Sequence, residues 1–328
     1  MAIGSGIGSQ LGAATESTYG TSATPTRFFE YDSESIDFDK TAQQGTGMRA
    51  GGQVVRANRR VVTMIGGKGD IQMDVPSKGF GFWLALAFGG TPTSAIQGAG
   101  PAYLHTFTPG DLLGKMATVQ VGVPQIGGTV TAKTALGTKV TDLELTAGLG
   151  EILTAKIGLD AADVRTDVAL ATASYASGAT TNVFHFAEGA ITIGGSAIAG
   201  VRSATVKLDN GLKTDRRHLG GLGKKAEPVI ADYRKISGKL EAEFVDTTFS
   251  AAYLTDAALA LVLTFTGPLI AATYFETLKI TVPVIKLDSQ MPDVSGADIV
   301  DMSLDFVGLD DGTNPPIKIE YTSTDVTP

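Results

Sequence analysis

Short segments in which apolar and polar residues alternate recur along the whole chain, and they constrain its fold more than any other feature. The clearest are residues 35–39, 70–75, 202–208 and 237–245. A period of two places one set of side chains in a core and the other in water, as a strand with one buried face requires. Further strands are expected at residues 115–121, 139–145, 153–159, 258–266, 278–287, 299–307 and 317–321. We therefore expect a mainly β fold.

Two segments between the strands have a different pattern. Residues 78–88 are largely apolar, follow Pro76 and end at Gly89, so we expect a short buried helix closed by glycine, with a buried strand as the alternative. Residues 248–255 are expected to form a second short helix. Each half of the chain would then contain one packed helix.

The second half of the chain repeats the order of the first. Residues 35–39 correspond to 205–209, and residues 69–75 correspond to 238–244, with an offset of about 170 residues at both anchors. Each strand of the first pair is followed by a long loop that contains glycine and arginine. Equal order at equal spacing is what a tandem duplication leaves behind, so a duplicated β domain is expected.

The expected organisation follows from this repeat and from local composition. The first residues are rich in Gly, Ser, Thr and Ala, which is typical of an extended arm without a core of its own. The four expected parts are a flexible arm at 1–27, a first domain at 28–168, a low-complexity linker at 169–181 and a second domain at 182–328.

Residues that could carry chemistry are sparse. The absence of cysteine excludes disulfides, thiolate metal sites and cysteine nucleophiles. The three histidines, His105, His185 and His218, lie far apart without the spacing of metal ligands. A Gly-rich turn at 66–69 lacks the first glycine and the final Ser or Thr of a phosphate loop. We therefore expect no catalytic site, no metal site and no cofactor, and the chain is not expected to be an enzyme.

Acidic residues gather near the C-terminus. The net charge of −8 argues against a domain that grips phosphates. Between Asp288 and Asp311 there is no Lys or Arg, and this stretch contains the aspartates Asp288, Asp293, Asp298, Asp301, Asp305, Asp310 and Asp311. They could form a solvated acidic surface, or they could line a channel whose like charge keeps DNA from sticking as it passes.

The two long loops, at 41–60 and 210–235, are basic. Their charged residues are Arg49, Arg56, Arg59 and Arg60 in the first loop, and Arg216, Arg217, Lys224 and Lys225 in the second. The charges could simply keep exposed loops soluble. They could instead dock onto an acidic surface of a neighbouring identical subunit, where many copies of a weak ion pair would set the register.

Signals for export and for membranes are not found. The first residues have no positive charge and no long apolar run, so no signal peptide is expected. The most apolar segments, 80–88 and 257–265, are far shorter than the roughly 18 residues that a membrane helix needs. The chain is therefore expected to be made and assembled in a cytoplasm.

Several segments within the first 90 residues occur together in a combination that is typical of one known protein family. These are the opening at 1–12, Glu16 with residues 18–21, and the segments 25–28, 58–62, 69–71 and 76–81. In this combination the chain resembles the major tail tube proteins of long-tailed, siphovirus-like bacteriophages. Over the rest of the chain, the resemblance depends on strand order and length.

The resemblance implies a fold and a function. The fold would be a β-sandwich or barrel-like core with one packed helix, and copies would form rings whose inner strands join into a barrel. Rings would stack into a hollow tube in the virion tail, through which genomic DNA passes, with the loops at 41–60 and 210–235 and the arm at 1–27 contributing to stacking. The implied partners are further copies of the chain, a tape-measure protein and a tail terminator, with no membrane.

The expected duplication adds a symmetry to this picture. If six tube domains make a ring and each chain carries two, three chains would form a ring with pseudo-sixfold symmetry. Two other classes of protein are the alternatives to a tail tube protein. A secreted or surface-layer β-sandwich adhesin would need an export signal and often calcium sites. A carbohydrate-active enzyme would need paired carboxylates in an aromatic groove, whereas Trp83 is the only tryptophan.

Overall fold

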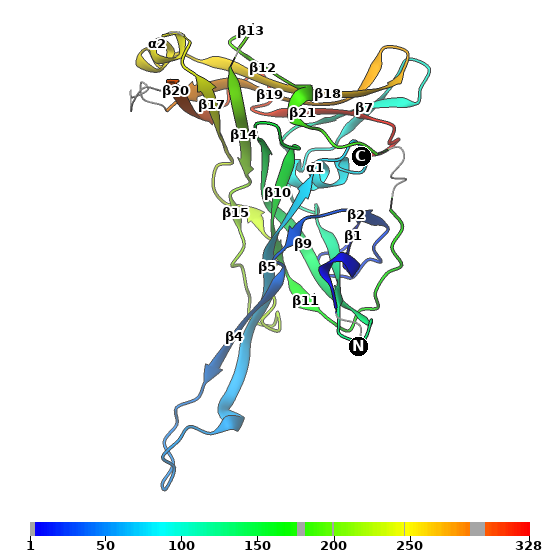
Figure 1. Ribbon diagram of the computed structural model, residues 1–328. Coiled ribbons are helices and arrows are strands. Elements are labelled where there is room, and N and C mark those ends of the chain that lie inside the picture. The colour runs from blue at the N-terminus through cyan, green and yellow to red at the C-terminus, as the bar shows by residue number, and fades with distance from the viewer. Residues whose placement is uncertain (1–3, 176–180, 199, 246, 289–298) are drawn as a thin grey trace.

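The computed structural model describes residues 4–175, 181–198, 200–245, 247–288 and 299–328. Within these residues, nineteen strands form one connected antiparallel network, and β15 (Leu212–Lys213) pairs separately with β16 (Val229–Ile230). Figure 1 shows a body made mostly of strands, with two short helices. The expectation of a mainly β fold is confirmed.

A long twisted sheet forms the frame of the molecule. Its order is β4 (Asp37–Gln44), β5 (Arg60–Asp74), β10 (Thr154–Ala161), β9 (Val130–Ala147), β14 (Val201–Asp209), β17 (Lys235–Glu243), β20 (Asp301–Gly308) and β19 (Tyr274–Leu287). The short strand β3 (Ser33–Glu34) extends the edge beside β5. Along these strands apolar residues point to the core in alternation, as Leu143 and Leu145 do in β9.

The order of pairing in the first half recurs in the second. In the first half, β9 also pairs with β11 (Asp163–Arg165) and β8 (Ala117–Pro124), then β8 pairs with β1 (Gln10–Thr15) and β1 with β2 (Arg27–Phe29). In the second half, β19 pairs with β21 (Lys318–Ser323) and β18 (Leu259–Ala271), then β18 pairs with β12 (Gly189–Ile193) and β12 with β13 (Ser196–Ala197). We call the strands of the first half, together with β3, β4, β5 and β10, the first unit, and the strands of the second half, together with β14, β17 and β20, the second unit.

Each unit contains one helix in the same place in its order. Helix α1 (Gly81–Phe88) follows β5, and α2 (Thr248–Leu254) follows β17. Helix α1 is apolar on all sides because it lies inside the core, and it ends at Gly89, whose φ of 75° is the left-handed conformation that glycine adopts readily. The expected helix at 78–88 is thus found, beginning at Gly81.

The N-terminal residues differ from the expected arm. Residues 10–15 form β1 between β2 and β8, and Leu11 and Ala13 are fully buried. The buried Glu16 carboxylate accepts hydrogen bonds from the Thr118 hydroxyl (2.7 Å) and from the Gly137 backbone N–H (2.9 Å). The expectation was wrong for this stretch because small residues can fill a strand where the space above it is narrow: a Cβ at Gly12 would lie 2.8 Å from the Phe28 ring.

Backbone pairing joins the two units inside the chain. Strand β9 of the first unit pairs with β14 of the second, and the hairpin of β6 (Thr93–Gln97) and β7 (Ala102–Phe107) pairs with β21. The expected linker at 169–181 is therefore not a break in the sheet. Its first residues lie along β8, where the Gln120 side chain binds the carbonyl of Ala169 and the N–H of Ala171, and its residues 176–180 lie outside the described part of the chain.

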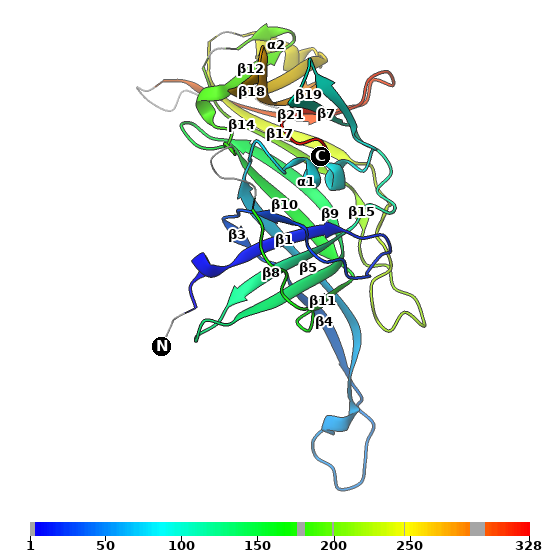
Figure 2. The same ribbon diagram turned by 90° about the vertical axis from the view of Figure 1, so that its right-hand side faces the viewer.

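The hairpin of β4 and β5 leaves the body of the molecule. Its strands continue beyond the edge of the sheet to a loop that contains a short 3₁₀ turn, Ala57–Arg59. Figures 1 and 2, in two perpendicular views, both show this hairpin extending away from all other elements. In both views the sheet runs from the hairpin at one end of the molecule to α2 at the other.

Candidate functional site: the polar sheet face and the two basic arms

One face of the long sheet is polar across both units, and we call it the polar face. Cross-strand neighbours form rows on it. One row runs through Gln72, Lys156, Glu144, Lys207 and Ser237. The next row runs through Asp74, Thr154, Thr146, Thr205, Lys239 and Asp305. Because the alternate residues of the same strands are buried, the polar face is a wetted wall along these two rows.

Two central lysines of the polar face are held by carboxylates. The Lys207 ammonium lies 3.4 Å from the Asp142 carboxylate, and the Lys239 ammonium lies 3.0 Å from that of Glu241. A hydrogen bond from Lys239 lowers the pKa of Glu241, and Ser203 adds to this effect. Such exposed pairs contribute only about 0–1 kcal/mol each to stability. Their main consequence is that these cations are occupied by neighbouring carboxylates of the same face.

Carboxylates outnumber bases on the polar face. Its acidic residues are Asp70, Asp74, Asp142, Glu144, Asp209, Glu241, Glu243, Asp301 and Asp305. Its basic residues are Lys68, Lys156, Arg202, Lys207, Lys235 and Lys239. These acids outnumber these bases, so the face as a whole repels anions.

The aspartates singled out in the sequence fall into three groups. Asp301 and Asp305 lie on the polar face, and Asp288 lies at its edge, where its N–H donates to the carbonyl of Asp305 (2.8 Å). Asp310 and Asp311 lie in the turn after β20, and Asp311 accepts from the N–H of Asn314 (2.7 Å).

The remaining two, Asp293 and Asp298, lie outside the described residues. The polar face also contains acids that the sequence analysis missed, among them Asp142, Glu144 and Glu241. The alternation of their strands was the signal that could have placed them on a wetted surface.

The first arm is the projecting part of the β4–β5 hairpin, residues 40–65. It contains Arg49, Arg56, Arg59 and Arg60 and no acidic residue. Arg49, Arg59 and Arg60 are exposed, and no ion pair to the arginines of this arm is found in the described part of the chain. Its apolar residues are exposed as well: Met48 fully, Val54 at 81% and Val61 at 55%. An exposed surface of this kind, apolar and of one charge, is typical of an interaction site.

The second arm, residues 210–234, is folded onto the first unit. Lys225 is buried there, with its ammonium 2.5 Å from the Asp160 carboxylate and 3.1 Å from the Gly67 carbonyl. Lys224 pairs with Asp163 at 2.9 Å. Burial raises the pKa of Asp160, and Lys225 opposes this shift.

The two arginines of the second arm also have partners inside the chain. Arg217 donates to the carbonyl of Ile65 (3.2 Å), and Arg216 donates to that of Glu227 (2.6 Å). The eight basic residues singled out in the sequence therefore divide into two sets. Those of the first arm have no ion pair in the described part of the chain, and those of the second arm are used within the chain. Sequence alone could not separate them, because an intrachain partner such as Asp160 is distant along the chain.

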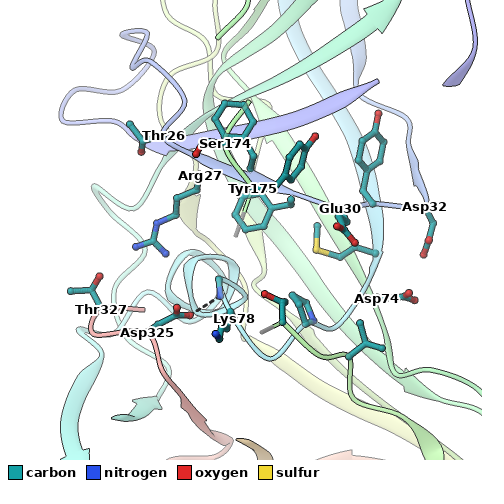
Figure 3. A pocket seen from close by; sticks show the side chains of 18 of the residues that line it. Thr26, Arg27, Glu30, Asp32, Asp74, Lys78, Ser174, Tyr175, Asp325 and Thr327 are labelled. Atoms are coloured by element: carbon teal, nitrogen blue, oxygen red, sulfur yellow. Dashed lines mark hydrogen bonds between the residues drawn. The ribbon is translucent and has the colours of Figure 1, made fainter. Parts of the chain in front are cut away.

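A cavity of about 720 Å³ lies where β2 and the residues after it, the turn before α1 and the C-terminal residues meet (Figure 3). Its wall carries both charges, including Arg27, Lys78 and Asp325, and the Asp325 carboxylate accepts from the Gly79 N–H at 2.6 Å. No histidine is among the described residues that line it. The mixed charges and the bonded Asp325 make it a junction between segments, without a recognisable reactive group.

We expect the stability of the chain to depend on pH through Asp74, one of the carboxylates that line this cavity. Burial raises the pKa of Asp74 above its ordinary value of 3.8, and the nearby Asp32 and Glu30 raise it further. A raised folded pKa means that the native state binds more protons than the unfolded state between pH 3.8 and the raised value. The contribution of Asp74 to the free energy of unfolding therefore increases as the pH falls through that window. This contribution is absent at neutral pH.

We expect Asp74→Asn to raise the thermal unfolding midpoint at pH 7, and the gain should disappear near pH 4. Thermal unfolding followed by circular dichroism at both pH values measures this. Asp311→Asn is the opposite control, because hydrogen bonds from Asn314 and Thr313 lower the pKa of Asp311 and its charge is favourable at neutral pH. A variant at Asp74 that is less stable than the parent at pH 7 would contradict the prediction.

Comparison with known proteins agrees with this geometry. A family model described as phage tail tube protein matches residues 6–308, which is most of the chain. A search of curated proteins found no match. In the described residues, no helix is both long enough and apolar enough to cross a membrane. With a mainly β structure and a family match over nearly its whole length, the chain belongs to the phage tail tube proteins, which are structural components of the virion tail.

Proposed function

We propose that copies of this chain join side by side into rings, and that the rings stack into a hollow tube whose channel is lined by the polar face. The observation that carries the proposal is the long sheet itself, apolar on one face, polar on the other and open at an edge. In the described residues, β4 pairs with β5 alone, so its outer edge has unpaired N–H and C=O groups. A strand from a neighbouring copy would pair with this edge, and closing the ring would remove free edges.

The polar face is suited to let DNA pass. DNA is a polyanion, and proteins hold it mainly through free Lys and Arg side chains that displace counterions. Lys207 and Lys239 are instead paired with carboxylates of the same face, and acids are in excess. Genomic DNA would therefore be repelled weakly and evenly along the channel, which favours rapid ejection.

The recurring strand order supports a tandem duplication and a ring of three chains. Each unit supplies four neighbouring strands to the long sheet, and the pairing of β9 with β14 joins the units within one chain. If equivalent pairing joins the second unit to the first unit of the next chain, three chains give six units around the ring. The ring would then have true threefold and approximate sixfold symmetry.

Other proteins would control the length of the tube. Contact between stacked rings is head to tail and never closes on itself, so stacking alone gives an open filament. We infer that a tape-measure protein and a tail terminator set its length, and that assembly takes place in the host cytoplasm.

Electron microscopy of the concentrated, purified chain tests the proposal. Hollow fibres of uniform width are expected, with a ring mass of three chains and a threefold average in views along the axis. A chain that stays monomeric at every concentration would contradict self-assembly. Rings of six chains would contradict the trimer alone and leave the tube standing.

A further inference from the structure

We propose that the two arms have different roles: the second arm is a fixed brace within the chain, and the first arm alone contacts a copy of the chain in the next ring. The inference rests on the proposed tube and goes beyond it, because it assigns one stacking arm to each chain. The two arms differ in length by one residue, so length does not distinguish them. Their surroundings do.

The second arm occupies a slot that is shaped for it. The Lys225 side chain crosses β5 directly above Gly66, where a Cβ would lie only 2.6 Å from the Lys225 Cε atom. At the end of the slot its ammonium meets Asp160, and the side chains of Lys225 and Asp160 are 5% and 6% exposed. The slot therefore needs a glycine at position 66 and a carboxylate at position 160.

The second unit lacks this slot. Lys68 pairs with Asp160, and its counterpart in the repeat, Ser237, pairs with Val307. Val307 thus stands where the carboxylate would be. The same alignment places Lys235 at the position of Gly66, so a side chain fills the space that Lys225 crosses in the first unit.

The second unit therefore offers no equivalent slot in which the first arm of a neighbouring chain could dock. It would need a buried carboxylate in the second unit, where Val307 stands instead. Docking against the second unit would also leave the arginines of the first arm without carboxylates like those that pair with Lys224 and Lys225. The first arm remains extended, with basic and apolar residues available to another molecule.

Charge along the molecule favours a second copy as that partner. The first arm lies beyond the Arg60 end of β5, whereas Asp74 lies at the opposite end of the same strand. At that opposite end of β17 and β20, Glu243 and Asp301 share one arginine, Arg202, at 2.9 Å each, which leaves this pair of carboxylates with a net negative charge. Copies stacked head to tail would thus place the basic first arm of one against an acidic end of the next. A ring of three chains would offer three such arms.

A disulfide can test whether the second arm stays docked. The chain has no native cysteine, so an introduced pair reports without background. The Lys225 Cγ atom lies 3.3 Å from the position of a Cβ on residue 66. In a disulfide, each sulfur lies about 3 Å from the Cβ of the other cysteine, so Gly66→Cys with Lys225→Cys fits this geometry. Asp160→Asn is added because Lys225→Cys would leave the buried Asp160 carboxylate without its ammonium partner.

The oxidised triple variant is expected to form tubes at a rate within about twofold of its reduced form, as measured by light scattering and microscopy. Failure of the disulfide to form in the folded chain would overturn the docked arm. Tube growth that stops on oxidation and returns on reduction would show that the second arm must leave its slot. If the unmodified chain itself forms no tubes, the proposed function fails, and the two failures are thereby distinguished.

Discussion

Replacing Arg59 and Arg60 by glutamate is expected to impair tube growth strongly while the chain stays folded. Both side chains are exposed on the first arm, and neither has an ion pair within the described residues, so the change breaks no intrachain ion pair there. An exposed ion pair contributes up to about 1 kcal/mol. Each added chain brings one first arm with two such pairs, so the change would reach about 2 kcal/mol per chain, which is roughly 30-fold in the concentration needed for growth.

The critical concentration for polymerisation, measured by sedimentation, checks this prediction. Arg59→Lys with Arg60→Lys is the matched control, since it keeps both charges and should polymerise nearly as the parent does. The thermal unfolding midpoint of both variants should equal that of the parent. Normal growth of the glutamate variant would remove these residues from any stacking role.

Replacing Trp83 by alanine is expected to have the largest effect on stability. Trp83 is fully buried in α1, and its ring centroid lies 5.2 Å from those of Phe29 and Phe82. Phe29 belongs to β2, so the cluster fixes the N-terminal strands to the core. Truncating a buried aromatic side chain costs about 3–5 kcal/mol through lost burial and the cavity left behind. In a chain of this size, the unfolding midpoint should fall by roughly 10 °C.

Circular dichroism is the suitable measurement, because Trp83 is the only tryptophan and its loss removes the fluorescence signal. Phe38→Ala is the matched control: Phe38 is 51% exposed on β4 and should cost less than about 1 kcal/mol. Equal losses at the two positions would contradict the assignment of Trp83 to the core.

Much of the fold follows from local pattern. The alternation at 70–75 and 237–245 overlaps the end of β5 and most of β17, and the apolar run before Gly89 contains α1. The prediction succeeded there because alternation and glycine termination are properties of neighbouring residues. It failed for β1, where Gly12 and Ala13 carry little hydrophobic signal although they pack closely.

By itself, the sequence determined the β class, the places of the two helices, the long basic loops and the resemblance to tail tube proteins. Only the tertiary structure decided which strands are neighbours, which acids share the polar face and which basic arm is docked. The physical reason is that sequence patterns involve neighbouring residues, whereas tertiary contacts join residues that are distant along the chain. A period of two records whether a side chain faces water, whereas the pairing of Lys225 with Asp160 depends on a distance through space that no local pattern contains.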